Sequence, residues 1–408
     1  MIERVFDHGR MQLRYSYRIE PTPGQRIALA RAFGCARVVY NDALCVREAA
    51  YRAGLPCPTD TELMRRVITL AKKTDNRAWL AEVSAAVLQQ SVADLNTAYR
   101  NFFASITGKR KGRKIAQPRL RSRKDPRQTV RLTRNARFQV TEIGRLRLPK
   151  IGDVRVRWSR DLPAEPSSVT IIKDAAGRYF ASFVVDASPA PLPAIDTETG
   201  IDLGLSCFAA FSDGRTVTSP RFLRRAERTL KRLQKTLSRK AKGSNNRQKA
   251  RVRLARAHAH VANARRDFHH KLSTTSVRDN QAVYVEDLAV SGLARGPLAK
   301  SVHDAGWSAF VRMLEYKAVK HGRVFARIGR FEPTTRTCSR CGWRGPKLGL
   351  SVRTFQCQDC LFVLNRDVNA ARNVLAAGRA ERLNACGDQV RPGTWAQVGE
   401  AGSHRGVV

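Results

Sequence analysis

Four cysteines near the end of the chain stand in two pairs with metal-ligand spacing. Cys338 and Cys341 form one Cys-x-x-Cys pair, Cys357 and Cys360 form the other, and 15 residues separate the pairs. Two such pairs supply the four thiolates of a tetrahedral zinc site. We therefore expect one structural Zn²⁺ here. A closed four-sulfur site has no open coordination position, so it would hold the segment in shape and would not catalyse.

Three acidic residues form a second candidate site. Asp202 lies in an apolar strand, Glu286 ends a later apolar strand, and Asp367 opens an expected helix seven residues after the last cysteine. An aspartate between apolar strand neighbours is costly to bury without a partner, which favours a functional role for Asp202. Strand, strand and helix, each with an acid and in this order, are typical of RNase H-like metal nucleases.

Each of the other two acids also has an ordinary structural interpretation. Glu286 could be a solvent-facing residue at a strand end, and so could its neighbour Asp287. We choose Glu286 because it falls in phase with Tyr284 along the strand. Asp367 could simply cap its helix. The order and setting of the three acids together favour the catalytic interpretation.

Three carboxylates that converge at about 4–6 Å raise one another's pKa values unless cations lie between them. Mg²⁺ prefers oxygen ligands and retains waters, so it suits such a site. Two ions about 3.5–4 Å apart would activate water and stabilise the leaving oxygen in phosphodiester hydrolysis. We therefore expect two Mg²⁺ ions at Asp202, Glu286 and Asp367.

The charge balance indicates a polyanionic partner. The chain has 408 residues, and its 75 Lys+Arg against 34 Asp+Glu give a formal net charge of +41. A charge of this size favours nucleic acid over an ordinary solvated surface. Because the sequence has neither a run of about 18 apolar residues nor a signal-peptide core, we expect no membrane span and no secretion. Nine cysteines in such a chain do not indicate a disulfide framework.

The first part of the chain is expected to form a strand and a small helical bundle. Thr22 followed by Pro23 is a helix start with the threonine as N-cap. After the strand at 11–19, apolar residues at helical spacing predict four helices, at about 24–33, 36–52, 60–73 and 80–104.

Basic residues then accumulate. The segment 109–127 carries ten basic residues and one acid, broken by glycine and proline, which indicates a loop that follows a phosphate backbone or a flexible solvated loop. Short alternating segments at 129–186 predict a β-barrel or curled sheet that includes the strand at 11–19. Its outward positions are mostly arginine, which favours phosphate contacts: Arg131, Arg137, Arg145, Arg147, Arg155 and Arg157.

The second part of the chain begins at a Pro-rich segment, 188–199, that marks a domain boundary. A strand and a strand hairpin follow, and then a basic antiparallel helical hairpin with its turn at 242–244. A buried strand at 282–287, one helix at 304–321 and a further strand lead into the cysteine segment. After Gly378 no period is sustained, so we expect a disordered tail.

Motifs along nearly the whole chain support a family resemblance. They are YRIEPTPGQ and FGCARVVYNDAL within 16–44, WLAEV and LQQSVADLNTAYRNFF within 79–103, GIDLGL at 200–205, VYVEDL at 283–288, DAGW and LEYKA within 304–318, TCSRCG with CQDC, and NRDVNAARN at 365–373. In these motifs the chain resembles the TnpB proteins, RNA-guided endonucleases of insertion sequences that are related to compact type V CRISPR effectors. The motifs together are very specific.

The resemblance implies an α+β multidomain chain. It implies an oligonucleotide-binding-like β-barrel (wedge) at 1–20 and 106–190, a helical recognition domain inserted at 21–105, an RNase H-like (RuvC) nuclease domain at 197–335 and 363–378, an inserted four-cysteine zinc finger at 336–362, and a tail at 379–408. It carries the catalytic role to the three acids, as Mg²⁺ ligands, and the zinc role to the four cysteines.

The resemblance also implies partners. They are a guide RNA from the transposon end and a double-stranded DNA target that is cleaved beside a short adjacent motif, with the protein as a monomer or homodimer on one RNA. The expected location is the prokaryotic cytoplasm, at the nucleoid and away from membranes. Candidate nucleic-acid contacts are Gln89 for the adjacent motif and the basic residues Lys109, Arg110, Lys111, Arg113, Lys114, Arg119, Arg121, Arg224, Arg225 and Lys231.

The chain departs from the family pattern at the second cysteine knuckle. Cys360 is followed by Leu361 where the family commonly has glycine, and Asn365 replaces the usual acid. A leucine forced to positive φ costs about 1 kcal/mol or more, which would loosen zinc binding. Two other functions stay open: a guided DNA-binding regulator that does not cut, and an unguided transposon DNA-binding factor. All three acids are present, which favours cleavage.

Overall fold

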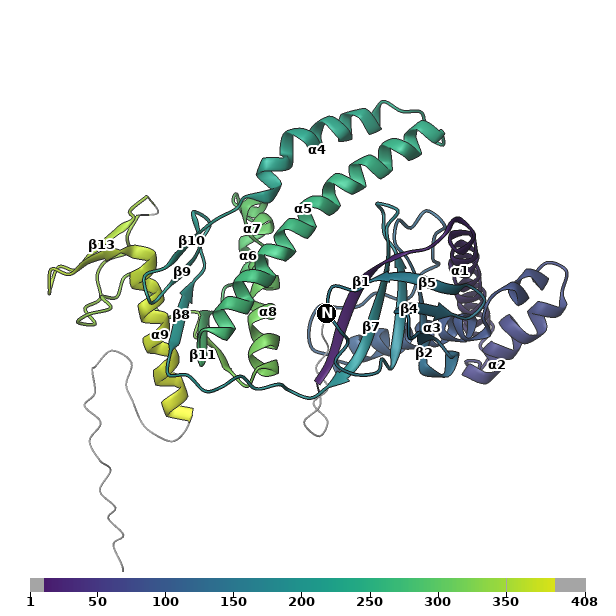
Figure 1. Cartoon of the computed structure of the whole chain (residues 1–408), viewed down its shortest axis with the longest axis horizontal. Coiled ribbons are helices and arrows are strands. Elements are labelled where there is room, and N and C mark those ends of the chain that lie inside the picture. The colour runs from purple at the N-terminus through teal and green to yellow at the C-terminus, as the bar shows by residue number, and fades with distance from the viewer. Residues whose placement is uncertain (1–10, 350, 386–408) are drawn as a thin grey trace, which may run out of the picture. The chain divides into compact units, whose positions relative to one another are not determined.

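The computed structural model describes residues 11–349 and 351–385, and the chain divides into two compact units, Met1–Ser188 and Pro189–Val408 (Figure 1). The division falls at the start of the Pro-rich segment 188–199.

The first unit contains a seven-stranded antiparallel sheet of order β2-β6-β7-β1-β5-β4-β3. Its strands are β1 Met11–Glu20, β2 Gln128–Thr133, β3 Gln139–Val140, β4 Arg145–Leu148, β5 Gly152–Arg157, β6 Ser168–Lys173 and β7 Tyr179–Ala187. Alternate residues of every long strand enter one core, which includes Tyr17, Leu146 and Phe183. The six outward arginines named above are exposed.

The connection between the two edge strands shows that this sheet is curled. The edge strands β2 and β3 are joined along the chain by residues 134–138 alone. That connection reaches about 21 Å at most, whereas a flat sheet of seven strands is about 29 Å wide. The sheet must therefore bend until its edges approach. No strand pairing joins β2 to β3 in the described ranges, so the sheet is curled and its two edges are not joined by hydrogen bonds.

The helices of the first unit differ in part from the prediction. Thr22 is the N-cap, in a capping box with Gln25, as expected. However, one helix, α1 Pro23–Arg52, replaces the two predicted at 24–33 and 36–52, because its buried face runs unbroken past Gly34. The remaining helical elements are α2 Asp60–Met64, a π-helical segment Arg65–Leu70, 3₁₀ segments Ala71–Lys73, Ala78–Glu82 and Arg134–Ala136, and α3 Ala85–Ile106.

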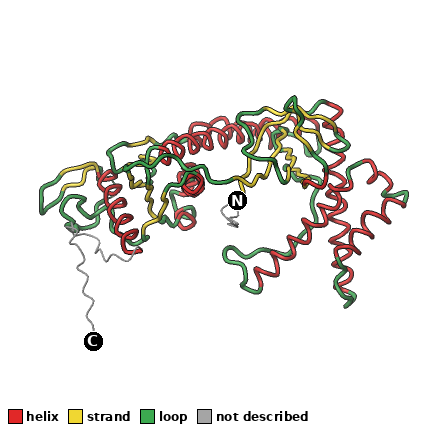
Figure 2. The backbone as a smooth tube through the Cα atoms, turned by 60° about the horizontal axis from the view of Figure 1, so that its bottom comes forward, coloured by secondary structure: helices red, strands yellow, loops and turns green. Residues whose placement is uncertain are grey.

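The second unit is built on a five-stranded sheet of order β10-β9-β8-β11-β12. Its strands are β8 Glu198–Asp202, β9 Cys207–Phe211, β10 Thr216–Thr218, β11 Ala282–Glu286 and β12 Val324–Ile328. β8, β11 and β12 run parallel, and β8, β9 and β10 are antiparallel neighbours. In Figure 2 the yellow strands of this sheet lie between red helices.

Helices cover both faces of this sheet. One face packs on α5 Asn245–Arg278 and α8 Trp307–Lys320, and the other packs on α9 Arg366–Ala385, which lies beside β8 in Figure 1. α4 Phe222–Ser238 pairs with α5 as the expected helical hairpin, with Gly243 at φ 87° in its turn. α6 is Val290–Leu293.

Two predictions about helix limits in this unit are wrong. The single helix expected at 304–321 is two helices, α7 Ala299–Ala305 and α8, separated by Gly306 at φ 67°. The tail expected to be disordered from residue 379 is helical as far as Ala385, because α9 continues. Its side chains Arg379 and Arg382 bind the carboxylate of Glu198 at 2.6 and 2.7 Å. Residues 386–408, including Cys386, lie outside the described residues.

The cysteine segment adds a small hairpin of β13 Thr354–Gln356 and β14 Val363–Asn365 ahead of α9. None of the helices in the described ranges is both long enough and apolar enough to cross a membrane.

Candidate functional site

Asp202 and Glu286 stand level at one edge of the five-stranded sheet. Each is the last residue of its strand, the two strands are parallel, and the register pairs Ile201 with Val285 directly before them. Ile201 and Val285 are buried on the α5–α8 face. Because successive side chains of a strand point to opposite faces, Asp202 and Glu286 project towards the face covered by α9.

Helix α9 can carry Asp367 to this edge because it packs very closely on β8. A β-carbon on Gly200 would lie 2.2 Å from the carbonyl oxygen of Ala371, so only glycine permits this approach. Asp367 belongs to the first turn of α9. The cap of that turn is Asn365, whose Oδ1 accepts the N–H of Asp367 at 2.9 Å and that of Val368 at 3.2 Å. Asp367 is therefore not needed as a cap.

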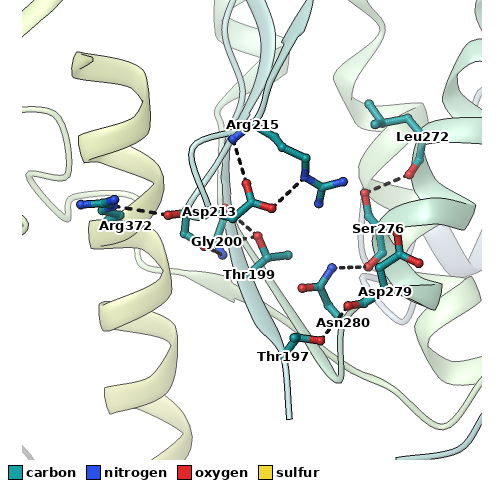
Figure 3. A network of polar contacts seen from close by, with 11 residues as sticks. Thr197, Thr199, Gly200, Asp213, Arg215, Leu272, Ser276, Asp279, Asn280 and Arg372 are labelled. Atoms are coloured by element: carbon teal, nitrogen blue, oxygen red, sulfur yellow. Dashed lines mark hydrogen bonds and ion pairs between the residues drawn. The ribbon is translucent and has the colours of Figure 1, made fainter. Parts of the chain in front are cut away.

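A polar network holds α9 against the β9–β10 hairpin (Figure 3). The Arg372 guanidinium of α9 donates to the backbone carbonyl of Ser212 at 3.3 Å, and the Ser212 hydroxyl accepts the N–H of Gly200 at 3.1 Å. Asp213, next along the hairpin, pairs with Arg215 at 2.7 Å. The middle of β8 and the second turn of α9 are thus fixed to the same loop.

The environment of Asp202 and Glu286 disfavours the ionised forms of these two carboxyl groups. Burial, reinforced by the charges of Glu286 and Asp367, raises the pKa of Asp202 to about 8, and only Arg366 and the Leu203 N–H oppose it. Burial also raises the pKa of Glu286, opposed by a hydrogen bond from Thr334. Among the described residues no lysine or arginine forms an ion pair with any of the three acids, although the chain has 75 such residues.

The neighbouring acid, Asp287, has a different environment. Its carboxylate is paired with Arg330 at 2.6 Å. The structure therefore separates the two candidates at the end of β11: Asp287 is neutralised, whereas Glu286 shares an edge with Asp202. This supports the choice of Glu286.

The four cysteines form a compact metal-binding set. Their sulfur atoms all lie within 4.8 Å of one another, with Cys338 Sγ 3.7 Å from Cys360 Sγ and Cys341 Sγ 3.6 Å from Cys357 Sγ. The edge of a zinc–sulfur tetrahedron with bonds of about 2.3 Å is about 3.8 Å, so the set fits Zn²⁺.

The three acids lie at a common sheet edge but are not gathered as closely as the cysteines. Within the described ranges the cysteines are the one set of three or more His, Cys, Asp or Glu side chains close enough to share an ion. The acids nevertheless offer oxygen donors that suit a hard divalent cation, and such a cation would relieve the repulsion of Asp202 by Glu286 and Asp367.

The second knuckle carries the strain that its sequence predicts. Leu361 has φ 55° and is exposed, whereas Gly342, at the equivalent place in the first knuckle, has φ 80°. The left-handed backbone suits glycine and costs leucine about 1 kcal/mol or more.

The predicted nucleic-acid contacts fall into two groups. Gln89, Lys109, Lys111, Arg113, Lys114, Arg119 and Arg225 are exposed, and Arg110 is half-buried. Three others are tied to neighbours: Arg121 stacks on the ring of Tyr40 at 3.7 Å, Arg224 donates to Ser301 Oγ at 2.9 Å, and Lys231 pairs with Glu227 at 3.0 Å.

Sequence reasoning missed several polar residues around the site. Thr334 donates its hydroxyl to Glu286, and Asn369 and Asn373 of α9 bind the loop that contains Thr334. The available signal was the spacing of the asparagines in NRDVNAARN, which puts both on one helix face.

Comparisons with known proteins agree along the chain. A family model described as a probable transposase (OrfB of IS605) matches residues 182–296, and that of the Cas12f1-like TNB domain matches 307–374. A helix-turn-helix model matches 11–55, although here those residues form β1 and the single helix α1.

Relatives cover nearly the whole chain. A protein of Streptomyces pristinaespiralis named as an RNA-guided DNA endonuclease is 43% identical, over 93% of this chain and 92% of its own length. InsQ of Escherichia coli, named likewise, is 30% identical over 93% and 95%.

A solved structure shares the fold. It is the Cas12f1 complex with guide RNA and target DNA, which matches at TM-score 0.53 and 11% identity, over 90% of this chain and 99% of that chain. Proteins of Acanthamoeba polyphaga mimivirus named TnpB-like match 31% of this chain at 27% identity. With full-length relatives at 43% and 30% identity, the chain belongs to the TnpB family.

Proposed function

We propose that this protein is an RNA-guided endonuclease that cleaves double-stranded DNA next to a short adjacent motif. The observation that carries the proposal is the set of three carboxylates at the carboxyl ends of β8 and β11 and the start of α9, none of which forms an ion pair with a lysine or arginine among the described residues. The names of the two full-length relatives support the RNA guide and the DNA target.

Asp202, Glu286 and Asp367 would hold two Mg²⁺ ions. Asp202 interacts electrostatically with both of the other acids, so bound cations would relieve the repulsion between its carboxylate and those of Glu286 and Asp367. When bound, the ions would activate a water nucleophile and stabilise the leaving oxygen of a phosphodiester. The protein's own part is to hold the three carboxylates at the carboxyl ends of β8 and β11 and in the first turn of α9, where bound cations would favour their ionised forms.

The same proposal assigns roles to the parts of the chain. The curled sheet with 106–190 is the wedge, the helices within 21–105 are the recognition domain, and 197–335 with 363–378 is the RuvC nuclease domain. The cysteine segment 336–362 is a zinc finger that holds the approach to α9. Gln89 and the exposed basic residues of 109–127 would contact RNA or DNA. The protein would act in the cytoplasm at the nucleoid, as a monomer or homodimer on one RNA.

The test is a cleavage assay with Asp202→Ala and the neighbouring control Asp287→Ala, each purified with RNA from its native flanking DNA. We expect Asp202→Ala to lose at least about 1,000-fold in cleavage rate with an unchanged RNA content. Asp287→Ala should still cleave, because its pairing with Arg330 is outside the proposed metal site. Cleavage by Asp202→Ala at the wild-type rate would refute the assignment of these three acids as the catalytic site.

Two other outcomes would replace the proposal. A wild-type complex that binds its target without cutting would identify a guided regulator. A purified protein without a discrete RNA would identify an unguided DNA-binding factor.

A further inference from the structure

The loop 329–337 connects β12 to the first cysteine knuckle and contacts both Glu286 and α9. Thr334, in its middle, is 5% exposed. Its hydroxyl donates to Oε1 of Glu286. This is the one hydrogen bond that the described structure gives the Glu286 carboxylate, and its donor lies 48 positions away in sequence.

Side chains of helix α9 bind this loop through hydrogen bonds. Asn373 Nδ2 donates to the carbonyl oxygens of Thr334 and Thr337, both at 2.7 Å. Further along the helix, the Glu381 carboxylate accepts the N–H of Gly329 at 3.2 Å. The backbone of Thr334 is therefore fixed to the helix that carries Asp367.

Asn369 of α9 binds both this loop and the first cysteine knuckle. Its Nδ2 donates to Thr337 O at 2.7 Å, and its Oδ1 accepts the N–H of Ser339 at 2.9 Å. Ser339 follows the zinc ligand Cys338 directly, and Asn369 is fully buried. Both polar ends of this amide are used, so its orientation is determined by the knuckle.

We propose that Thr334, Asn369 and Asn373 are positioning residues that join the zinc knuckle, α9 and Glu286 into one rigid unit, so that the knuckle sets the affinity of the acid site for divalent cations. This rests on the proposed function of the three acids. The physical reason is that Asn373 holds the backbone of Thr334 to α9 while the Thr334 hydroxyl binds Glu286. The Glu286 carboxylate is thereby fixed relative to Asp367 on the same helix. Partners of this kind around metal ligands are worth about 10- to 100-fold in metal affinity.

In this arrangement the zinc site influences the geometry of the acid site, although the two sites share no ligand residue. Loss of zinc would free Ser339 and Thr337 from their fixed geometry, release Asn369, and leave Thr334 held by fewer contacts. The structure thus gives the zinc segment a second role beyond folding its own residues.

The test is Mn²⁺ binding to full-length, zinc-loaded protein freed of nucleic acid at high salt, followed by electron paramagnetic resonance. Binding to Asp202→Ala is subtracted to isolate the acid site. We expect Thr334→Val, which keeps the shape but removes the hydroxyl, to bind Mn²⁺ about tenfold more weakly. Thr334→Ser should stay within about twofold of wild type, and the exposed neighbour variant Thr335→Val should be unchanged.

A second variant distinguishes the loss of these hydrogen bonds from misfolding of the protein. Asn373→Asp keeps the size of the side chain but removes both donated hydrogen bonds, so it should weaken Mn²⁺ binding while one zinc per chain is retained. The Mg²⁺ concentration for half-maximal cleavage should rise in parallel. Equal Mn²⁺ affinity in wild type, Thr334→Val and Asn373→Asp would overturn the inference but leave the proposed nuclease intact. Absence of an Asp202-dependent Mn²⁺ site in wild type would instead refute the acid site itself.

Discussion

Gly378 of α9 lies directly on the ring of Tyr284 in β11: a β-carbon on this glycine would be 2.1 Å from Cδ1 of the tyrosine. Tyr284 is fully buried, so its ring cannot move aside. Together with Gly200 under Ala371, this contact brings the helix backbone down onto the sheet. The depth of α9 on the sheet, and with it the place of Asp367, is set by two glycines.

Gly378→Ala should therefore destabilise the second unit. Overpacking costs about 1–3 kcal/mol, which exceeds the gain of up to about 1 kcal/mol from replacing a helical glycine. Gly34→Ala is the matched control, since Gly34 is also helical and a β-carbon there would have no atom within 4 Å. Calorimetry should show a lower unfolding temperature for Gly378→Ala and an equal or higher one for Gly34→Ala. Equal effects of the two substitutions would contradict the close packing.

The sequence could predict the features that depend on residues close together along the chain. Asp202, Glu286 and Asp367 could be chosen because each stands in a local pattern of strand or helix with an acid. The cysteine knuckles are also local, and so is the positive φ at Leu361, since it follows from the second cysteine of a knuckle.

The sequence could not predict contacts between distant segments. The continuation of α9 depends on Glu198, which Arg379 reaches across 181 positions, and the segment has no helical period of its own. Nothing local in the sequence singles out Thr334, because its partner Glu286 lies 48 positions earlier, at the end of β11. The two helices predicted at 24–33 and 36–52 are one helix, because apolar residues on either side of Gly34 enter one core.

The raised pKa of Asp202 predicts a pH-dependent stability. The unfolded carboxyl ionises near pH 4, whereas the folded one does so near pH 8. Between these values the folded state binds more protons than the unfolded state, so stability falls as pH rises. In magnesium-free buffer, which leaves zinc in place, wild type should lose at least about 2 kcal/mol more than Asp202→Asn between pH 5 and pH 8.

Mg²⁺ should reverse this loss, because a cation favours the ionised carboxylates. Thermal unfolding at pH 8 should therefore show stabilisation of wild type by Mg²⁺, little at pH 5, and none for Asp202→Asn at either pH. If Mg²⁺ stabilised both proteins alike, the ion would bind elsewhere.

The strained knuckle predicts that zinc binding can be improved by one substitution. Leu361→Gly relieves a left-handed leucine, worth about 1 kcal/mol, and should tighten zinc binding about fivefold. Gly342→Leu creates the same strain in the first knuckle, where φ is 80°, and should weaken binding by a similar factor. Competition with a chromophoric zinc chelator measures both. A tighter site in Gly342→Leu would show that φ does not control affinity here.

Two arginines of the basic segment should behave in opposite ways. Arg121 is held by Tyr40, by Asp94 at 3.6 Å and through its backbone by Asn41, so Arg121→Ala should destabilise the first unit by about 1–2 kcal/mol and change nucleic-acid binding little. Arg119 is exposed without a partner in the described part, so Arg119→Ala should leave stability within about 0.5 kcal/mol.

Binding of a single-stranded RNA over a range of salt concentrations separates the two. If Arg119 meets a phosphate, Arg119→Ala should reduce the slope of log K against log salt by about 0.7, because one fewer counterion is released. Arg121→Ala should keep the wild-type slope. The reverse pattern would mean that the stacking of Arg121 on Tyr40 gives way when nucleic acid binds, and that Arg121 is the phosphate contact.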